Sequence, residues 1–303
     1  LSVAAGMEAD ALLISAMLAV THPASRDKLV LRTVPLTARW RGRRPLGKGI
    51  AVNPAAEQLP TPDDVDHPIG LGRKPEGLEG RRRNQVALLE RYGLEPHSQV
   101  LEIGCGVGWL AYDLASRLGA DGSYAGFDVS PEAIDWLNAN LAPRLRNFRF
   151  DLLDVANPRY RPEGRQIASD VRFPYPDDAF DLVCAYGVFM HIAQLGIENY
   201  LREIARTLQA GRPALVNFMA ITDLDRNPRN GKREYVESSP GVYTNRPDRE
   251  GWSLAFDDTL VRSMIDAAGL SIIAAEEGGW HGRRTPAEGA VPGADLYVVT
   301  PRT

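Results

Sequence analysis

The sequence predicts an α/β protein with a doubly wound, mostly parallel sheet of seven strands. From residue 80 onward, short apolar segments alternate with longer segments of helical pattern. The short segments are almost continuously apolar, which is typical of strands that helices cover on both faces. The last two strands follow each other without a helix between them. This predicts an antiparallel strand at one edge of the sheet.

The elements follow in order along the chain. Strands are predicted at residues 99–103, 124–128, 148–153, 180–186, 213–219, 270–275 and 295–300. Helices are predicted at 81–92, 109–118, from 131, at 197–208 and at 257–268, and glycines end three of them at Gly93, Gly119 and Gly269. Ser130 is expected to cap the helix that Pro131 begins.

The first 79 residues have a different composition. After a short helix predicted at 8–20, prolines recur at 35, 45, 54, 60, 62, 68 and 75, which prevents long helices and central strands. Residues Arg26 to Lys48 contain eight basic residues and one acid. We therefore divide the chain into an irregular N-terminal arm or lid, 1–79, and a domain, 80–303.

The composition is that of an ordinary globular protein: 303 residues, 44% hydrophobic, 24% charged, with a net charge of −4. This argues against a nucleic-acid partner. The two cysteines, Cys105 and Cys184, lie in apolar runs and form neither a disulfide framework nor a metal-binding spacing. The apolar stretch 11–20 is about half the length of a membrane span. These observations predict a cytoplasmic protein without a membrane span.

A glycine-rich turn follows the first predicted strand. Gly104, Gly106 and Gly108 lie between this strand and a helix, where glycines let a ligand approach the backbone amides. A dinucleotide site needs a glycine where Trp109 stands, so a nicotinamide oxidoreductase is a weak alternative. An acid at the strand tip, Glu102, repels a pyrophosphate and attracts an ammonium group. Asp128 ends the second strand, where a carboxylate accepts ribose hydroxyls.

These motifs resemble a known family. V-L-E-I-G-C-G-V-G is similar to the first motif of class I S-adenosyl-L-methionine (SAM)-dependent methyltransferases, and G-F-D-V-S-P to their second-strand motif. Further runs resemble a bacterial subgroup that is encoded beside glycosyltransferases and acts on sugars or glycans: residues 124–128, 135–136, 147–150, 172–176, 188–191 and 279–283. The resemblance covers about residues 80–301. It implies a Rossmann-like fold, SAM as methyl donor, and O-methylation of a sugar or polysaccharide hydroxyl.

The resemblance also implies roles for single residues. The methionine end of SAM would be held by Glu102, Gly104, Cys105, Gly106 and Gly108, the ribose by Asp128 and Val129, and the adenine by Asp154 with Val155. Tyr186 would form the floor beneath the transferable methyl group.

An alcohol acceptor must lose its proton as it attacks, and a side chain with a pKa near neutrality suits this task. His191 lies just beyond the fourth strand, at the carboxyl edge where such folds bind ligands. It is the candidate general base; the alternative is a histidine that caps or packs a helix start.

Substrate contacts are predicted from the loops at the same edge. Trp280, His281 and Arg283 lie between the last two strands, where a ring can stack on a sugar face and an arginine can bind hydroxyls or a carboxylate. A tight β turn is the alternative. The long polar segments 158–178 and 222–251 also belong at this edge. In and next to the second segment, Tyr235, Tyr243 and Trp252 are candidate pocket aromatics.

Other functions stay open at this point. The acceptor atom could be a nitrogen, a carbon or a carboxylate of another small metabolite, or the protein could bind SAM without catalysis. No metal site is predicted, because no acidic spacing singles one out, although a divalent cation such as Mg²⁺ stays open. The arm could also pair two copies in a homodimer.

Overall fold

The computed structural model describes residues 59–60, 75–222, 229–230, 233–249, 251–280 and 293–302. The predicted helix at 8–20, the basic segment 26–48, His281 and Arg283 lie outside the described residues. The domain boundary predicted between residues 79 and 80 falls inside helix α1, which spans Pro75–Arg91.

The main sheet has seven strands, in the order β12-β13-β5-β4-β1-β2-β3. Their bounds are β1 Gln99–Ile103, β2 Ser123–Asp128, β3 Phe148–Leu152, β4 Leu182–Ala185, β5 Ala214–Phe218, β12 Leu270–Glu276 and β13 Asp295–Pro301. Strand β13 pairs antiparallel with both β5 and β12. The antiparallel strand therefore lies one place in from the edge, because β12 takes the edge position and the chain returns between β12 and β5.

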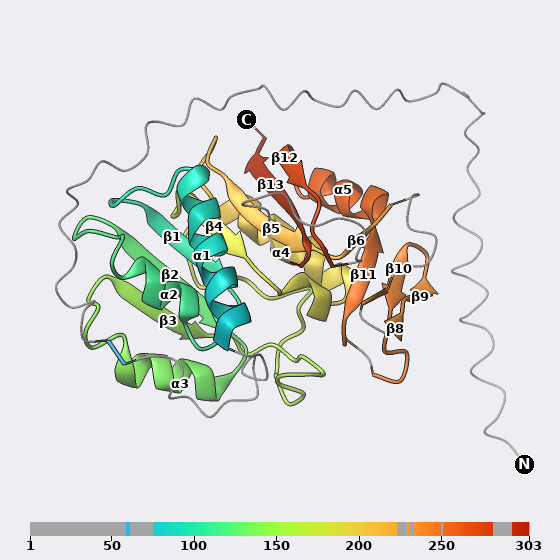
Figure 1. Cartoon of the computed structure of the whole chain (residues 1–303), viewed down its shortest axis with the longest axis horizontal. Helices are drawn as coiled ribbons and strands as arrows, with labels where there is room; N and C mark the ends of the chain where they lie inside the picture. The colour runs from blue at the N-terminus through green and yellow to red at the C-terminus, as the bar shows by residue number, and fades with distance from the viewer. Residues whose placement is uncertain are drawn as a thin grey trace, which may run out of the picture. The chain divides into compact units, whose positions relative to one another are not determined.

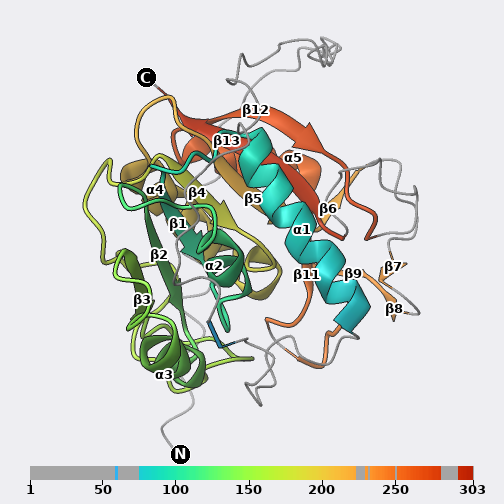
Figure 2. The same ribbon diagram turned by 60° about the vertical axis from the view of Figure 1, so that its left-hand side comes forward.

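Helices cover both faces of this sheet. Residues of α1, α2 (Trp109–Leu114) and α3 (Pro131–Asn140) share one buried cluster, and residues of α4 (Gln194–Thr207) and α5 (Asp258–Ala267) share another. Successive strand residues alternate between the two, since Val100 belongs to the first cluster and Leu101 to the second. Figures 1 and 2 show α1 crossing the face of the sheet. The prediction of a doubly wound sheet is confirmed.

The predicted cap of α3 is confirmed as well. Ser130 precedes the helix with an extended backbone, and its hydroxyl accepts a hydrogen bond from the Ala133 amide at 3.3 Å. Pro131 occupies the first helical position, where a backbone N–H would have no partner within the helix, so the N–H that proline lacks is not missed. This cap holds the start of α3 beside the end of β2.

A second sheet is formed by two strands inside the predicted long polar segment 222–251 and by the two strands that flank it. It has four strands in the order β6-β11-β10-β9, with β6 Ala220–Ile221, β9 Val236–Ser239, β10 Val242–Thr244 and β11 Leu254–Asp257. A separate pair joins β7 Arg229–Asn230 and β8 Arg233–Glu234. All residues of β9 are exposed, so the sequence has no apolar pattern that would predict this strand. Strand β6 follows β5 almost directly and thus attaches the small sheet to the carboxyl end of β5.

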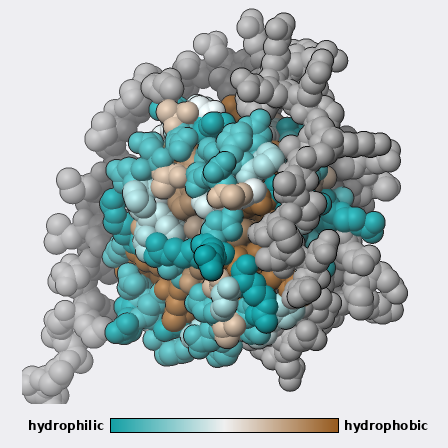
Figure 3. Space-filling model, turned by 90° about the vertical axis from the view of Figure 1, so that its left-hand side faces the viewer, coloured by the Kyte–Doolittle hydropathy of each residue, from teal (hydrophilic) through white to brown (hydrophobic). Residues whose placement is uncertain are grey.

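Hydrophilic side chains cover most of the described surface in the view of Figure 3, and apolar side chains show between them. Among the described residues, no helix combines the length and apolar character needed to cross a bilayer.

Candidate active site

A cavity of about 870 Å³ lies at the carboxyl ends of the central strands. One wall comes from the residues that follow β1, β2, β3 and β4, as expected for ligand sites in open parallel sheets. The opposite wall comes from α4 and from the small sheet, through Tyr200, Ser238, Val242 and Leu254. Both long polar segments contribute residues, which confirms their predicted place at this edge.

Seven of the predicted site residues line this cavity: Gly104, Gly106, Asp128, Val129, Val155, Tyr186 and His191. Five others do not line it: Glu102, Cys105, Gly108, Asp154 and Trp280. The first group lies at or near the carboxyl ends of strands. In the second group Glu102 and Trp280 are buried, Cys105 and Gly108 belong to the glycine turn, and Asp154 is half-buried just beyond β3.

The turn after β1 is fitted closely to its surroundings. Gly104 has φ +72°, and a Cβ placed there would lie 2.6 Å from a methyl group of Val188. At Gly106, with φ +53°, a Cβ would meet no atom within 4 Å. A glycine at 104 is therefore required both by the backbone and by the close approach of Val188, and Gly106 leaves open space beside the cavity.

Asp128 joins this turn to the start of α3. Its Oδ2 accepts a hydrogen bond from the Gly106 amide at 2.8 Å, and its Oδ1 accepts one from the Ser130 amide at 2.9 Å. The side chain is buried, yet it lines the cavity. A carboxylate has further lone pairs for ligand hydroxyls while it keeps both amide bonds.

Glu102 is buried behind the turn. Its Oε2 accepts a hydrogen bond from the Tyr124 hydroxyl at 2.5 Å. Burial raises the pKa of this carboxyl group to about 8, and the hydrogen bond from Tyr124 only partly opposes the effect. The sequence predicted contact with a methionine ammonium group; in the structure the Glu102 side chain contacts Tyr124 and does not line the cavity.

The raised pKa of Glu102 predicts that the protein loses stability as pH rises from about 4.5 to 8. In this window the folded state keeps a proton that the unfolded state releases, so the free energy of unfolding falls with rising pH. The full effect is about 5 kcal/mol at most, from 1.36 kcal/mol per pKa unit. Glu102→Gln should remove this dependence, which thermal unfolding at pH 5 to 9 measures.

Glu276→Gln is the matched control. The Glu276 carboxylate also accepts from a tyrosine hydroxyl, that of Tyr92 at 3.0 Å, but it is paired with Arg91 near the surface. Its variant should keep the pH dependence of the wild type. Parallel pH profiles for the wild type and Glu102→Gln would contradict the assignment to Glu102.

Asp154 was predicted to bind adenine. Its carboxylate instead forms an ion pair with Arg161 at 2.8 Å and another with Arg165, whose hydrogen bond lowers the pKa of Asp154. Val155 and Ala156 line the cavity at this point. The wall beside the predicted adenine site is therefore apolar, and the Asp154 oxygens are engaged by guanidinium groups.

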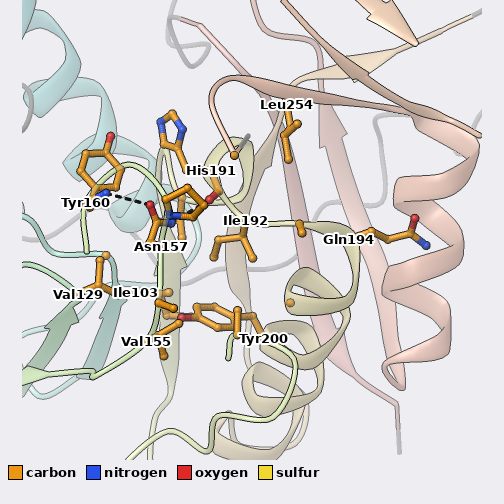
Figure 4. Close-up of a pocket in the computed structure, with 18 of the residues that line it drawn as sticks. Ile103, Val129, Val155, Asn157, Tyr160, His191, Ile192, Gln194, Tyr200 and Leu254 are labelled. Carbon is orange, nitrogen blue, oxygen red and sulfur yellow. Dashed lines mark hydrogen bonds between the residues drawn. The ribbon is translucent and has the colours of Figure 1, made fainter. Parts of the chain in front are cut away.

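His191 lines the cavity from the short 3₁₀ helix Phe189–His191. Its backbone carbonyl accepts a hydrogen bond from the side-chain amide of Asn157 at 3.0 Å. The Tyr160 ring packs edge-on against the imidazole, with 5.4 Å between the ring centres. Figure 4 shows Asn157 bridging Tyr160 and His191 through two hydrogen bonds. These contacts fix the position of His191 at the cavity.

The imidazole of His191 is held in its neutral form. Burial, and then the nearby Arg159 guanidinium, lower its pKa to about 4, while the Gly251 carbonyl acts in the opposite direction. Nη1 of Arg159 lies 3.3 Å from Nε2 of His191. Because a guanidinium can only donate, Nε2 accepts this bond and the proton is assigned to Nδ1.

Trp280 was predicted to bind substrate, and the structure places it elsewhere. Its indole N–H donates to Asp295 Oδ2 at 2.8 Å, and its ring packs edge-on against Tyr235, itself a candidate pocket aromatic. Both rings are buried in a small cluster with Met219 and Ile221. Trp280 therefore packs at the junction of the two sheets and does not line the cavity.

Sequence reasoning missed Asn157, Tyr160 and Tyr200 as cavity residues, and Arg159 as a neighbour of His191. The sequence signal for Asn157, Arg159 and Tyr160 was available in part, because residues 157–160 follow β3 at the carboxyl edge. Tyr200 lies in the second turn of α4, and its apolar spacing predicted only core packing.

The cavity offers groups that suit a nucleoside with a charged tail. Asp128 can accept from ribose hydroxyls, and Val129 and Val155 provide apolar walls. Tyr186 also lines the cavity, and its hydroxyl is buried without a hydrogen-bond partner. An unpaired buried hydroxyl is costly, so this group is a candidate to bind a polar group of a ligand.

No group of three or more His, Cys, Asp or Glu side chains among the described residues is placed to hold a metal ion.

Comparison with known proteins agrees with this geometry. Residues 100–211 match the model of a family described as a methyltransferase domain. "Methyltransferase GfsG" of Streptomyces halstedii is 31% identical over 154 residues, which is 48% of this chain and 47% of that protein. A probable cobalt-precorrin-6B C(15)-methyltransferase (decarboxylating) of Thermoplasma acidophilum is 31% identical over 86 residues, 27% of this chain and 43% of that protein. The chain thus spans less than half the length of these curated relatives.

Solved structures share the fold. An S-adenosylmethionine-dependent methyltransferase from Mesorhizobium loti superposes with a TM-score of 0.51 at 15% identity, covering 74% of this chain and 100% of that one. Residues 100–211 thus match a methyltransferase domain, and the strand order with the cavity at the carboxyl edge agrees with the fold of SAM-dependent methyltransferases.

Proposed function

We propose that this protein transfers a methyl group from SAM to a hydroxyl group of a sugar or glycan, with His191 as the general base. The observation that carries the proposal is the place of His191. A neutral imidazole lines the same cavity as the glycine turn and Asp128, and the hydrogen bond that its Nε2 accepts from Arg159 is one that a substrate can replace.

Bound SAM supplies a methyl group on a positively charged sulfur, which is already activated toward nucleophiles. The remaining task of the protein is to align the acceptor and remove its proton, and alignment alone contributes much of the rate. Asp128 would hold the ribose of SAM, and Tyr186 would offer its unpaired hydroxyl to the methionine end of SAM. Val129 and Val155 would enclose the adenine.

His191 would accept the hydroxyl proton at Nε2. The proton already on Nδ1 leaves the Nε2 lone pair as the basic site, and Nε2 now accepts from Arg159. Arg159 must leave this position, or shift, for a hydroxyl to reach the lone pair. Departure of the cation also raises the basicity of the imidazole, because the Arg159 charge is one cause of its low pKa.

Polar groups on the cavity wall support a hydroxylated acceptor. Asn157, Ser169, Gln194, Ser238 and Ser239 line the cavity with amide and hydroxyl groups, which both donate and accept. Sugars present alternating donors and acceptors over an apolar ring, and the mixed wall suits that pattern. The resemblance to glycan-associated methyltransferases supports the same substrate class.

Labelled SAM tests the proposal directly. The protein is incubated with SAM carrying a trideuterated methyl group and with panels of saccharides, amines, phenols and carboxylic acids, each with and without Mg²⁺. We expect the label in an alkali-stable methyl ether of a saccharide, identified by mass spectrometry. Label only on an amine, a carbon or an alkali-labile ester, or SAM breakdown that no acceptor accelerates, would refute sugar O-methylation.

A further inference from the structure

We infer that the acceptor carries an anionic group, a carboxylate or a phosphate, which binds to an arginine cluster formed by Arg159, Arg246 and Arg249 around Trp252. This inference rests on the proposed function, because it assigns the substrate class of the same cavity. The cluster lies beside His191, next to the cavity residues Pro158, Tyr160 and Gly251, and only its member Arg159 enters the chemistry described above.

The cluster is assembled from two segments that are far apart in the sequence. The guanidinium carbons of Arg159 and Arg249 each lie 4.6 Å from the centre of the Trp252 ring, and that of Arg246 lies 5.3 Å away. Arg159 follows β3, whereas the other residues precede β11. The two segments meet at Pro158, which lies 3.5 Å from where a Cβ on Gly251 would stand.

The cluster has more positive than negative charge. Arg246 donates two hydrogen bonds to Asp248, at 3.0 and 3.1 Å, and Arg249 lies 3.7 Å from the same carboxylate. Within the part of the chain that the structure describes, Arg159 has no carboxylate partner. Three cations around one ring thus share one exposed carboxylate, and an added anion would relieve their mutual repulsion.

Arginine is suited to this role. Its planar guanidinium group binds carboxylates and phosphates through paired hydrogen bonds, and stacking on an aromatic ring fixes its orientation without using its donors. The Trp252 ring holds the guanidinium groups in this way on the side of the cavity where Pro158, Tyr160 and Gly251 form the wall.

The contact between Arg159 and His191 connects the anion to the reaction. Arg159 donates to Nε2 of His191, the same lone pair that the acceptor hydroxyl needs. An anionic group that engages Arg159 would draw the guanidinium away and free Nε2. A neutral sugar lacks this group and would have to compete with Arg159 for His191. The cluster would therefore select anionic acceptors at the catalytic step as well as in binding.

Matched acceptors test the inference. Methyl β-D-glucuronide carries a carboxylate at C6 where methyl β-D-glucoside carries a hydroxymethyl group, and glucose 6-phosphate carries a phosphate on the 6-hydroxyl of glucose; comparing the two pairs identifies which anion is preferred. We expect the wild type to favour the anionic member of at least one pair in kcat/KM. Arg159→Gln should reduce that preference roughly 10- to 100-fold, which corresponds to the loss of one charge-assisted hydrogen bond.

Arg262→Gln is the control variant. Arg262 also lies near an aromatic ring, 5.7 Å from the centre of Tyr297, and pairs with Asp258 on α5, away from the cavity residues. Arg262→Gln removes the same charge from the protein as Arg159→Gln does, and it should leave the acceptor preference unchanged. Circular dichroism and thermal unfolding verify that both variants fold like the wild type.

Calorimetric binding of the same probes, with S-adenosylhomocysteine present, separates this inference from the proposed function. Anion binding that depends on Arg159, without methyl transfer to any saccharide, would refute the function and support the anion site. Equal methylation of charged and neutral sugars, with no effect of Arg159→Gln on their ratio, would overturn the anion site and leave the function standing. Neither binding nor transfer would overturn both.

Discussion

Asp128→Asn is expected to weaken SAM binding by at least about 100-fold, since it removes the charged acceptor for ribose hydroxyls, and charge-assisted hydrogen bonds contribute about 1.5–3 kcal/mol each. The carboxylate also accepts from the amides of Gly106 and Ser130, at 2.8 and 2.9 Å. An asparagine can accept from only one of these amides and turns an N–H group toward the other. Titration calorimetry with SAM measures the change in affinity.

Asp128→Ala extends the same prediction to stability. It leaves the Gly106 and Ser130 amides without their acceptor, and the latter is buried, so we expect the free energy of unfolding to fall by roughly 2–4 kcal/mol. Asp151→Ala is the control, because Asp151 lies one strand away, accepts from the Tyr175 hydroxyl at 3.0 Å and does not line the cavity. SAM affinity in Asp128→Asn equal to that of the control would show that the ribose binds elsewhere.

His191→Gln should lower kcat by roughly 10²- to 10⁴-fold, the usual contribution of a positioned general base. SAM affinity should change less than about threefold, because the general base acts on the acceptor hydroxyl and not on SAM. His97→Gln provides the comparison, since His97 is exposed near the start of β1 and pairs with Glu95. A kcat in His191→Gln within threefold of the wild type would remove His191 from the reaction.

The pH profile tests the same assignment. His191 has a pKa lowered to about 4 by burial and by Arg159, so the base is unprotonated at all higher pH values. We expect kcat/KM to be level from about pH 5 upward and to fall below it. Arg159→Gln removes one cause of the low pKa, so the acidic limb should move toward the ordinary histidine value near 6.5. Identical pH profiles for the wild type and Arg159→Gln would contradict the contact between Arg159 and His191.

The domain core could be predicted from the sequence because its signals are local. Continuous apolar runs identified the parallel strands, Ser130 and Pro131 identified the start of α3, and the spacing of Gly104 and Gly106 identified the turn at the cavity. Each of these depends on the conformational preferences of neighbouring residues or on burial of one short segment. The small sheet could not be predicted, because its strands are short and β9 is exposed.

The predicted site residues also divide into those that a local sequence signal placed correctly and those that depend on tertiary packing. Gly104, Asp128, Tyr186 and His191 reach the cavity because each lies at the carboxyl end of a parallel strand or within a few residues of it, and such strands end at one edge. Trp280 does not reach it, although its neighbours suggested a substrate loop: its indole N–H finds Asp295, and its ring is buried with Tyr235. Whether an aromatic ring turns inward or toward a ligand depends on packing partners that sequence spacing does not reveal.

The sequence by itself determined the doubly wound sheet, the glycine turn with its acidic strand tips, and the edge at which a ligand binds. Only the tertiary structure decided that Glu102 faces Tyr124 and that Arg159, His191 and Trp252 meet. These three residues belong to separate loops whose paths depend on long-range packing and on charge in three dimensions. Such contacts carry no periodic pattern along the chain, and they set the charge and basicity of the site.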